Sequence, residues 1–271
     1  MNRHDTWAAG DIPGDKYDTA RYYDYLLGGF HNFEIDRKIG DMLIEACPDV
    51  RLGALVNRAF LRRAVKFLCQ QGVEQFLDIG SGIPTSGNVH EVAQRINPSA
   101  RVVYVDIDPI AVIHSQAILK DNPNATAIQE DIQDITQILE NPSFTKLIDL
   151  ARPLGVFMVA VLHFVKDDGQ LLKILRTLNA SLVAGSFLVI SHYTDEDVPI
   201  ETLEQIRKVT AGVGSAAVSR GFAKVASLFA GYELIEPGVV RVPLWRPEGP
   251  EDVLLEQPER AMGYCGIGRM L

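Results

Sequence analysis

Cysteine is scarce in this sequence. The 271 residues include only Cys47, Cys69 and Cys265, and they form no CxxC pair and no cysteine and histidine spacing of a zinc site. An odd, scattered set of this kind argues against both a disulfide framework and a structural zinc ion. We therefore expect no metal ion, and we expect the protein to work in the reducing environment of the cytoplasm.

The sequence also lacks an excess of positive charge and long hydrophobic runs. It has 26 Lys and Arg against 35 Asp and Glu, a net charge of −9, so no general attraction to nucleic acid or anionic lipid is expected. The longest apolar run, residues 154–165, is interrupted by His163 and is too short to span a bilayer. The first 25 residues contain no secretory signal pattern. We expect neither a nucleic-acid partner nor a membrane.

The first quarter of the chain combines a polar arm with a helical region. Residues 1–17 are polar, contain two glycines and a proline, and predict a loosely held arm. From residue 19 to about 71 the pattern is helical and includes one apolar stripe, formed by Val56, Phe60, Leu61, Ala64, Val65 and Leu68. We therefore expect residues 1–71 to form a flexible arm and a helical cover.

After Gly72, short β-rich runs alternate with helical segments. Strands are predicted at residues 75–79, 101–106, 125–129, 155–162 and 186–191, mostly as continuous apolar runs typical of parallel strands buried on both faces. Helices are predicted at residues 88–96, 110–119, 132–139, 170–182 and 199–213. A helix at 222–229 and strands at 233–235, 239–243 and 264–267 follow. The alternation predicts an α/β fold with a doubly wound, mostly parallel sheet over residues 72–271, integrated with the helical cover into one domain.

The first predicted strand ends in a glycine turn just before a helix, with the sequence Asp-Ile-Gly-Ser-Gly-Ile-Pro-Thr over residues 78–85. Gly80 and Gly82 would let a ligand approach the backbone, at the end of the sheet where such folds bind ligands. Thr85 stands where a dinucleotide fingerprint has its third glycine, which argues against an NAD-type oxidoreductase. An ordinary tight turn is the alternative interpretation.

The second and third predicted strands end in acidic residues. Asp106 could accept hydrogen bonds from ribose hydroxyls, whereas Asp108 before Pro109 suits a helix N-cap, and we favour these two roles. Asp131 could accept a hydrogen bond from an exocyclic amine such as that of adenine, or it could cap the next helix. Both interpretations of Asp131 stay open.

Together these residues resemble the S-adenosylmethionine-dependent methyltransferases of Rossmann-like fold, which have Asp-x-Gly-x-Gly, a second-strand acid and a third-strand Asp-Ile at these places. The resemblance implies a seven-stranded sheet with an antiparallel last strand and the cofactor S-adenosyl-L-methionine. It assigns Gly80 and Gly82 to the methionine and ribose portion, Asp106 to the ribose, and Asp131 with Ile132 to adenine. The cofactor-binding set that we predict comprises Arg21, Tyr25, Asp78, Gly80, Ser81, Gly82, Thr85, Asp106, Ile107, Asp131, Ile132 and Ala160.

A narrower resemblance covers nearly the whole chain. Residues 20–37 read Ala-Arg-Tyr-Tyr-Asp-Tyr-Leu-Leu-Gly-Gly-Phe-His-Asn-Phe-Glu-Ile-Asp-Arg, and with residues 88–94, 190–193 and 266–269 they resemble an actinobacterial methyltransferase family long catalogued as a domain of unknown function. We expect this polar and aromatic segment to act as a lid, with Arg21 as a partner of the cofactor carboxylate. A packing helix ended by a glycine C-cap is the alternative.

His163 follows the fourth predicted strand and is the candidate general base, since an imidazole titrates near neutral pH. A strand-end histidine with a structural role is the alternative. We expect methyl transfer to a small or medium-sized acceptor. Two other functions stay open: a non-catalytic nucleoside-binding regulator and, less favoured, an NAD-type oxidoreductase. The sequence indicates neither the acceptor nor the oligomeric state.

Overall fold

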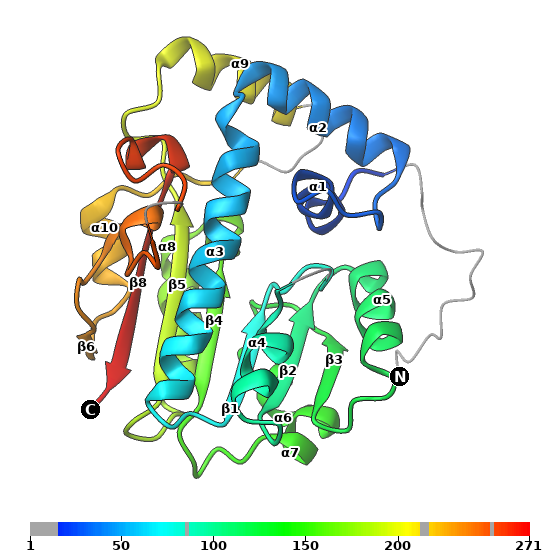
Figure 1. Cartoon of the computed structure of the whole chain (residues 1–271), viewed down its shortest axis with the longest axis vertical. Coiled ribbons are helices and arrows are strands. Elements are labelled where there is room, and N and C mark those ends of the chain that lie inside the picture. The colour runs from blue at the N-terminus through cyan, green and yellow to red at the C-terminus, as the bar shows by residue number, and fades with distance from the viewer. Residues whose placement is uncertain (1–15, 85–86, 212–216, 250–251) are drawn as a thin grey trace.

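The computed structural model describes residues 16–84, 87–211, 217–249 and 252–271. The expected arm over residues 1–17 lies almost wholly outside the described residues. Within them, one sheet has the strand order β3-β2-β1-β4-β5-β8-β6, and β7 pairs with β8 (Figure 1). The strands are β1 (Gln75–Ile79), β2 (Arg101–Asp106), β3 (Ala125–Gln129), β4 (Gly155–Val159), β5 (Phe187–Tyr193), β6 (Tyr232–Leu234), β7 (Val240–Arg241) and β8 (Gly263–Met270).

The predicted fold class is confirmed. Strands β1 to β5 are parallel, and β8 is antiparallel to β5. β1, β2 and β3 have the expected bounds. β4 ends at Val159, earlier than expected, because Ala160 adopts a φ of 58° and the chain then enters the 3-10 helix η1 (Leu162–Phe164). The two-residue β7 is an addition to the seven strands that the family resemblance implies.

Helices cover both faces of the sheet (Figure 1). α3 (Asp49–Gln70), α4 (Val89–Ile96) and α5 (Pro109–Leu119) contribute to one buried cluster. α6 (Ile135–Glu140), α7 (Pro142–Leu147), α8 (Asp168–Asn179) and α10 (Phe222–Ser227) surround the other. The apolar stripe predicted in α3 lies buried in the first cluster. α6 begins three residues later than expected because Asp134 caps it, accepting a hydrogen bond from the Gln137 amide.

The helical N-terminal layer lies beyond the carboxyl ends of the parallel strands (Figure 1). It consists of α1 (Thr19–Leu26) and α2 (Glu34–Ala46), and α9 (Ile200–Ala211) extends it. α1 contacts α2 and α3, and α2 contacts α9. The cover therefore lies over the edge of the sheet where α/β proteins bind ligands. None of the helices in the described part of the chain is long and apolar enough to cross a membrane.

Candidate functional site

A cavity of about 850 Å³ is lined both by the carboxyl ends of the parallel strands and by the helical cover. Residues of β1, β2, β4 and β5 and of the loops after all five parallel strands line one side, and residues of α1, α2, α3 and α9 line the other. The predicted residues that line the cavity are Asp78, Gly80, Ser81, Gly82, Asp106, Ile107, Asp131, Ile132, Ala160 and His163. The sequence thus predicted which edge of the sheet these cavity-lining residues share.

The glycine turn after β1 requires at least one of its glycines. Gly80 and Gly82 have φ values of +72° and +62°, in the left-handed region. A Cβ on Gly80 would lie 2.3 Å from Val161 Cγ2, a separation that packed carbon atoms do not tolerate. The Gly82 amide donates a hydrogen bond to Asp106 Oδ2 at 2.7 Å. The turn is therefore fixed against the end of β2, and its backbone faces the cavity.

The acids after β2 and β3 differ in their surroundings. Asp106 is buried, and burial is the main cause that raises its pKa. Asp108 Oδ1 accepts a hydrogen bond from the Ile110 amide at 3.1 Å, so the predicted N-cap is confirmed. Asp131 does not cap α6, because Asp134 does. Asp131 instead accepts from the Gln133 amide in a local turn and lines the cavity.

A buried aspartate and a buried arginine lie beside the glycine turn. Asp78 is 4% exposed, and burial raises its pKa to about 7, although the charge of Arg58 opposes this shift. Arg58 is 7% exposed and donates to Asn88 Oδ1 at 3.2 Å, and its Nε has no hydrogen-bond partner among the described residues. Both side chains line the cavity. The site therefore holds a buried cation with a donor that the protein leaves unused.

Arg58 was missed by the sequence analysis. Ala54, Arg58 and Leu61 all line the cavity and follow helical spacing along α3. The predicted stripe of α3 marks the face that packs on the sheet. The spacing of Ala54, Arg58 and Leu61 marks a second face, and this spacing is the signal that could have predicted Arg58. Local sequence alone does not distinguish Arg58 from the other arginines of α3, Arg51, Arg62 and Arg63.

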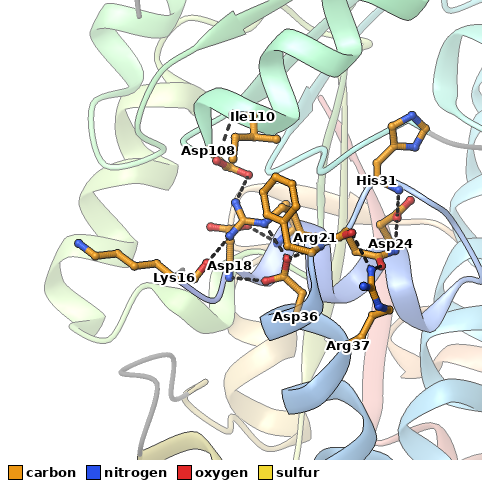
Figure 2. Close-up of polar contacts among 12 residues, drawn as sticks. Lys16, Asp18, Arg21, Asp24, His31, Asp36, Arg37, Asp108 and Ile110 are labelled. Atoms are coloured by element: carbon orange, nitrogen blue, oxygen red, sulfur yellow. Dashed lines mark hydrogen bonds and ion pairs between the residues drawn. The ribbon is translucent and has the colours of Figure 1, made fainter. Parts of the chain in front are cut away.

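Arg21 is not placed to meet a ligand in the cavity, so its predicted role is corrected. It is 3% exposed, and its Nε donates to Asp36 Oδ2 at 2.8 Å (Figure 2). Its Nη1 lies 3.3 Å from Asp108 Oδ2, and its Nη2 donates to the Lys16 carbonyl. The guanidinium is therefore used within the protein, where it joins α1 to α2 and to the turn after β2.

Tyr25, which was also predicted, does not line the cavity. Its ring packs against Gly40 of α2 and its hydroxyl donates to Asp41 Oδ1 at 2.5 Å. Tyr22 and Tyr23 of α1 line the cavity. α1 therefore contributes to the cavity through different side chains from those expected. Thr85 lies outside the described residues.

A hydrogen-bonded chain holds Ala160 in its left-handed conformation. The Ala160 amide donates to Ser191 Oγ at 3.0 Å, and Ser191 Oγ donates to Asn57 Oδ1 at 2.6 Å. Asn57 Nδ2 in turn donates to the Tyr23 hydroxyl at 2.9 Å. The end of β4 is therefore connected through β5 and α3 to α1. A strained residue held in this way is typical of a functional site.

Two neutral histidines line the cavity after β4 and in β5. Burial lowers the pKa of His163 to about 3 and that of His192 to about 4, with Arg220 a further cause. Arg220 Nη1 lies 2.9 Å from His192 Nε2, and His192 Nδ1 lies 2.7 Å from the Tyr193 carbonyl, so Nδ1 carries the proton. His163 Nδ1 has no partner among the described residues. Across these residues no group of three or more histidine, cysteine or acidic side chains could hold a metal ion.

Comparisons with known proteins agree with the geometry. The family model described as S-adenosyl methyltransferase matches residues 5–271. A Thermobifida fusca YX protein assigned as a methyltransferase is 37% identical, with 97% of this chain and 99% of that one covered and a TM-score of 0.88. A DUF574 family protein from Streptomyces avermitilis MA-4680 is 35% identical, with 95% and 99% covered and a TM-score of 0.89. Among curated proteins, none matches the chain.

Proposed function

Because the chain belongs to the S-adenosyl methyltransferase family, we propose that it transfers a methyl group to a small or medium-sized acceptor by in-line displacement. The cofactor of this family is S-adenosyl-L-methionine. The observation that carries the proposal is that the glycine turn, Asp106 and Asp131 line one cavity that continues beneath the helical cover. A transferase needs such a space, because donor and acceptor have to be held side by side.

The residues at the strand ends fit this cofactor. The Gly80 to Gly82 turn presents backbone without a Cβ, and Asp106 is a buried acceptor suited to ribose hydroxyls. Asp131 and Ile132 would hold the adenine, as the family resemblance implies. Asp78 and Arg58 supply opposite charges for the ammonium and carboxylate of the amino-acid portion. In this assignment Arg58 takes the role that the sequence analysis gave to Arg21.

When bound, S-adenosyl-L-methionine supplies a sulfonium methyl group, whose carbon–sulfur bond breaks with its electron pair on sulfur as the acceptor's lone pair forms the new bond. The protein therefore has to align the acceptor and remove at most one proton. We assign that proton to Nδ1 of His163, because His163 lines the cavity and this nitrogen has no hydrogen-bond partner among the described residues. Burial lowers the pKa of His163 to about 3, so the imidazole is a weaker base than the sequence analysis expected. The Ala160 backbone, fixed by Ser191, would lie against the reacting groups.

The same proposal has three further parts. The partner of the protein is its small-molecule acceptor, the protein does not bind nucleic acid, and it works in the cytoplasm. The acidic net charge of −9 supports the second point. The free thiols of Cys47, Cys69 and Cys265 support the third, because reduced cysteines persist in the cytoplasm.

Thermal unfolding with added nucleosides tests the proposal. S-adenosyl-L-methionine or S-adenosylhomocysteine at ~100 times its dissociation constant adds about 2.7 kcal/mol, which for a chain of this size raises the unfolding midpoint by roughly 5–10 °C. NAD at the same concentration should cause no shift. In Asp106→Ala the shift should be lost, because the ribose loses its acceptor.

Asp134→Ala is the matched control, since Asp134 is an exposed helix cap that does not line the cavity. This variant should keep the full shift with both sulfur nucleosides. A wild-type protein that responds only to NAD, or to none of the three compounds, would remove the methyltransferase proposal.

A further inference from the structure

The cavity extends beyond the residues assigned to the cofactor. Its far part, which we name the apolar chamber, is lined by Tyr22, Leu43, Cys47, Tyr193, Leu203 and Ile206. These residues come from α1, α2, the residue that follows α2, β5 and α9. They belong to one space, because all six line the same cavity and because α2 contacts both α1 and α9.

The apolar chamber carries no formal charge at neutral pH. Burial raises the pKa of Tyr22 and of Cys47 and raises that of Tyr193 to about 12, so all three stay protonated. His163 and His192, between the chamber and the cofactor end, stay neutral. Two charged lining residues, Asp195 and Arg207, lie close enough to Tyr193 to influence its pKa. Asp195 is half-buried and accepts a hydrogen bond from the Ser219 hydroxyl, and Arg207 is exposed. The six chamber residues themselves offer a ligand no compensating charge.

Two residues that line the cavity carry polar atoms that the protein does not use. The Tyr22 hydroxyl and His163 Nδ1 are buried and have no hydrogen-bond partner among the described residues. Because buried polar atoms are normally paired, these two suit a ligand with hydrogen-bonding groups that the side chains can turn to meet. The whole cavity, at about 850 Å³, is in the range of small-molecule sites.

We propose that the apolar chamber binds the methyl acceptor and that this acceptor is an uncharged, mainly apolar small molecule with a hydroxyl or amine as its reacting group. The proposal rests on the proposed methyltransferase function and names the acceptor class for the same site. The apolar body lies between Leu43, Leu203 and Ile206, and the reacting group points toward His163. α9 therefore acts as the wall that determines which acceptors fit.

The test uses N-phenyl-1-naphthylamine, an uncharged apolar amine whose fluorescence rises on leaving water. The full-length protein is first saturated with S-adenosylhomocysteine, so that only the chamber remains available. We expect one saturable site for the probe. Ile206→Trp should fill the chamber and lower the affinity for the probe at least tenfold. Leu203→Lys should lower it as much by introducing a charge.

Gln205→Trp is the matched control, because Gln205 is an exposed neighbour on α9 that does not line the cavity. It should change probe affinity less than twofold. α9 has no buried residue, so these variants do not disturb the core. Calorimetric measurement of S-adenosylhomocysteine binding verifies that each variant is folded. The acceptor proposal alone would be overturned if the protein binds S-adenosylhomocysteine but not the probe, or if both tryptophan variants lose probe affinity equally. If the wild type does not bind S-adenosylhomocysteine, the proposed function itself is overturned.

Discussion

Gly80 and Gly72 share a backbone conformation but differ in their surroundings. Their φ values are +72° and +82°, so alanine at either position adopts a left-handed conformation, which costs about 1–2 kcal/mol. A Cβ on Gly72 meets nothing within 4 Å, whereas one on Gly80 would lie 2.3 Å from Val161 Cγ2. Overpacking of that kind costs a further ~1–3 kcal/mol. Urea unfolding should therefore show a clearly larger loss of stability for Gly80→Ala than for Gly72→Ala.

The Val161→Ala background separates the two contributions. Removing the Val161 methyl groups leaves the left-handed cost unchanged and removes the 2.3 Å contact with Cγ2, whereas the 2.6 Å contact with the Cβ of residue 161 stays. Gly80→Ala should therefore cost less in that background, but still more than Gly72→Ala. Equal losses for Gly80→Ala and Gly72→Ala in the wild-type background would show that Val161 does not confine the turn.

The sequence predicts the position of a residue well where topology alone determines it. Asp78 and Asp106 lie at the ends of β1 and β2, and Asp131 follows β3. The carboxyl ends of these neighbouring parallel strands meet at one edge, and all three residues line the cavity. Arg21 could not be placed in this way, because its partner Asp108 is 87 residues away in the sequence. Tyr25 was predicted in place of Tyr22 and Tyr23, because the local pattern does not show which tyrosine of α1 packs on α2.

At the scale of elements, α1 is joined to the rest of the molecule through a buried ion-pair cluster (Figure 2). Arg21 of α1 binds Asp36 of α2 and Asp108 at the start of α5, and these side chains are at most 6% exposed. Removing one partner of a buried pair leaves uncompensated charge and costs about 3–5 kcal/mol. Arg21→Met should therefore lower the free energy of unfolding by that amount, measured by urea unfolding, or detach α1. Detachment would appear as faster hydrogen exchange of residues 19–26.

Arg37→Met is the control from the same segment. Arg37 is exposed and donates only to the Asn32 carbonyl and side-chain oxygens in the described structure. Its replacement should cost less than about 1 kcal/mol. Similar losses for the two variants would mean that the buried cluster does not hold α1 in place.

The order and type of elements were predictable, but several ends were not. β1, β2 and β3 follow from apolar runs between polar turns, and they begin and end as expected. The end of β4 depends on the left-handed Ala160, which is held by Ser191 from a strand 31 residues away. The start of α6 depends on which of two nearby aspartates, Asp131 or Asp134, caps it. Tertiary contacts decide such details, and local spacing does not contain them.

At the scale of the whole molecule, two parts of the chain line the cavity together. Asp18 and Ala20 belong to the N-terminal cover, and Gly82 and Asp106 belong to the sheet, yet all four line the same cavity. A Cβ on Gly82 would lie 4.0 Å from that of Ala20. Asp18 is sufficiently buried beside Asp108 and Asp106 that its pKa rises to about 6. A ligand that contacts both sides should therefore stabilise the cover on the sheet.

Hydrogen exchange with and without saturating S-adenosylhomocysteine measures this closure. We expect amides of residues 18–36 to exchange at least tenfold more slowly with the ligand, because opening of the cover then requires its release. α7 lies at the opposite end of the sheet and serves as the internal reference (Figure 1). Its exchange should change less, since it has no contact with the cavity. Unchanged exchange at residues 18–36, with the ligand bound, would mean that the cover is a fixed wall of the site rather than a lid.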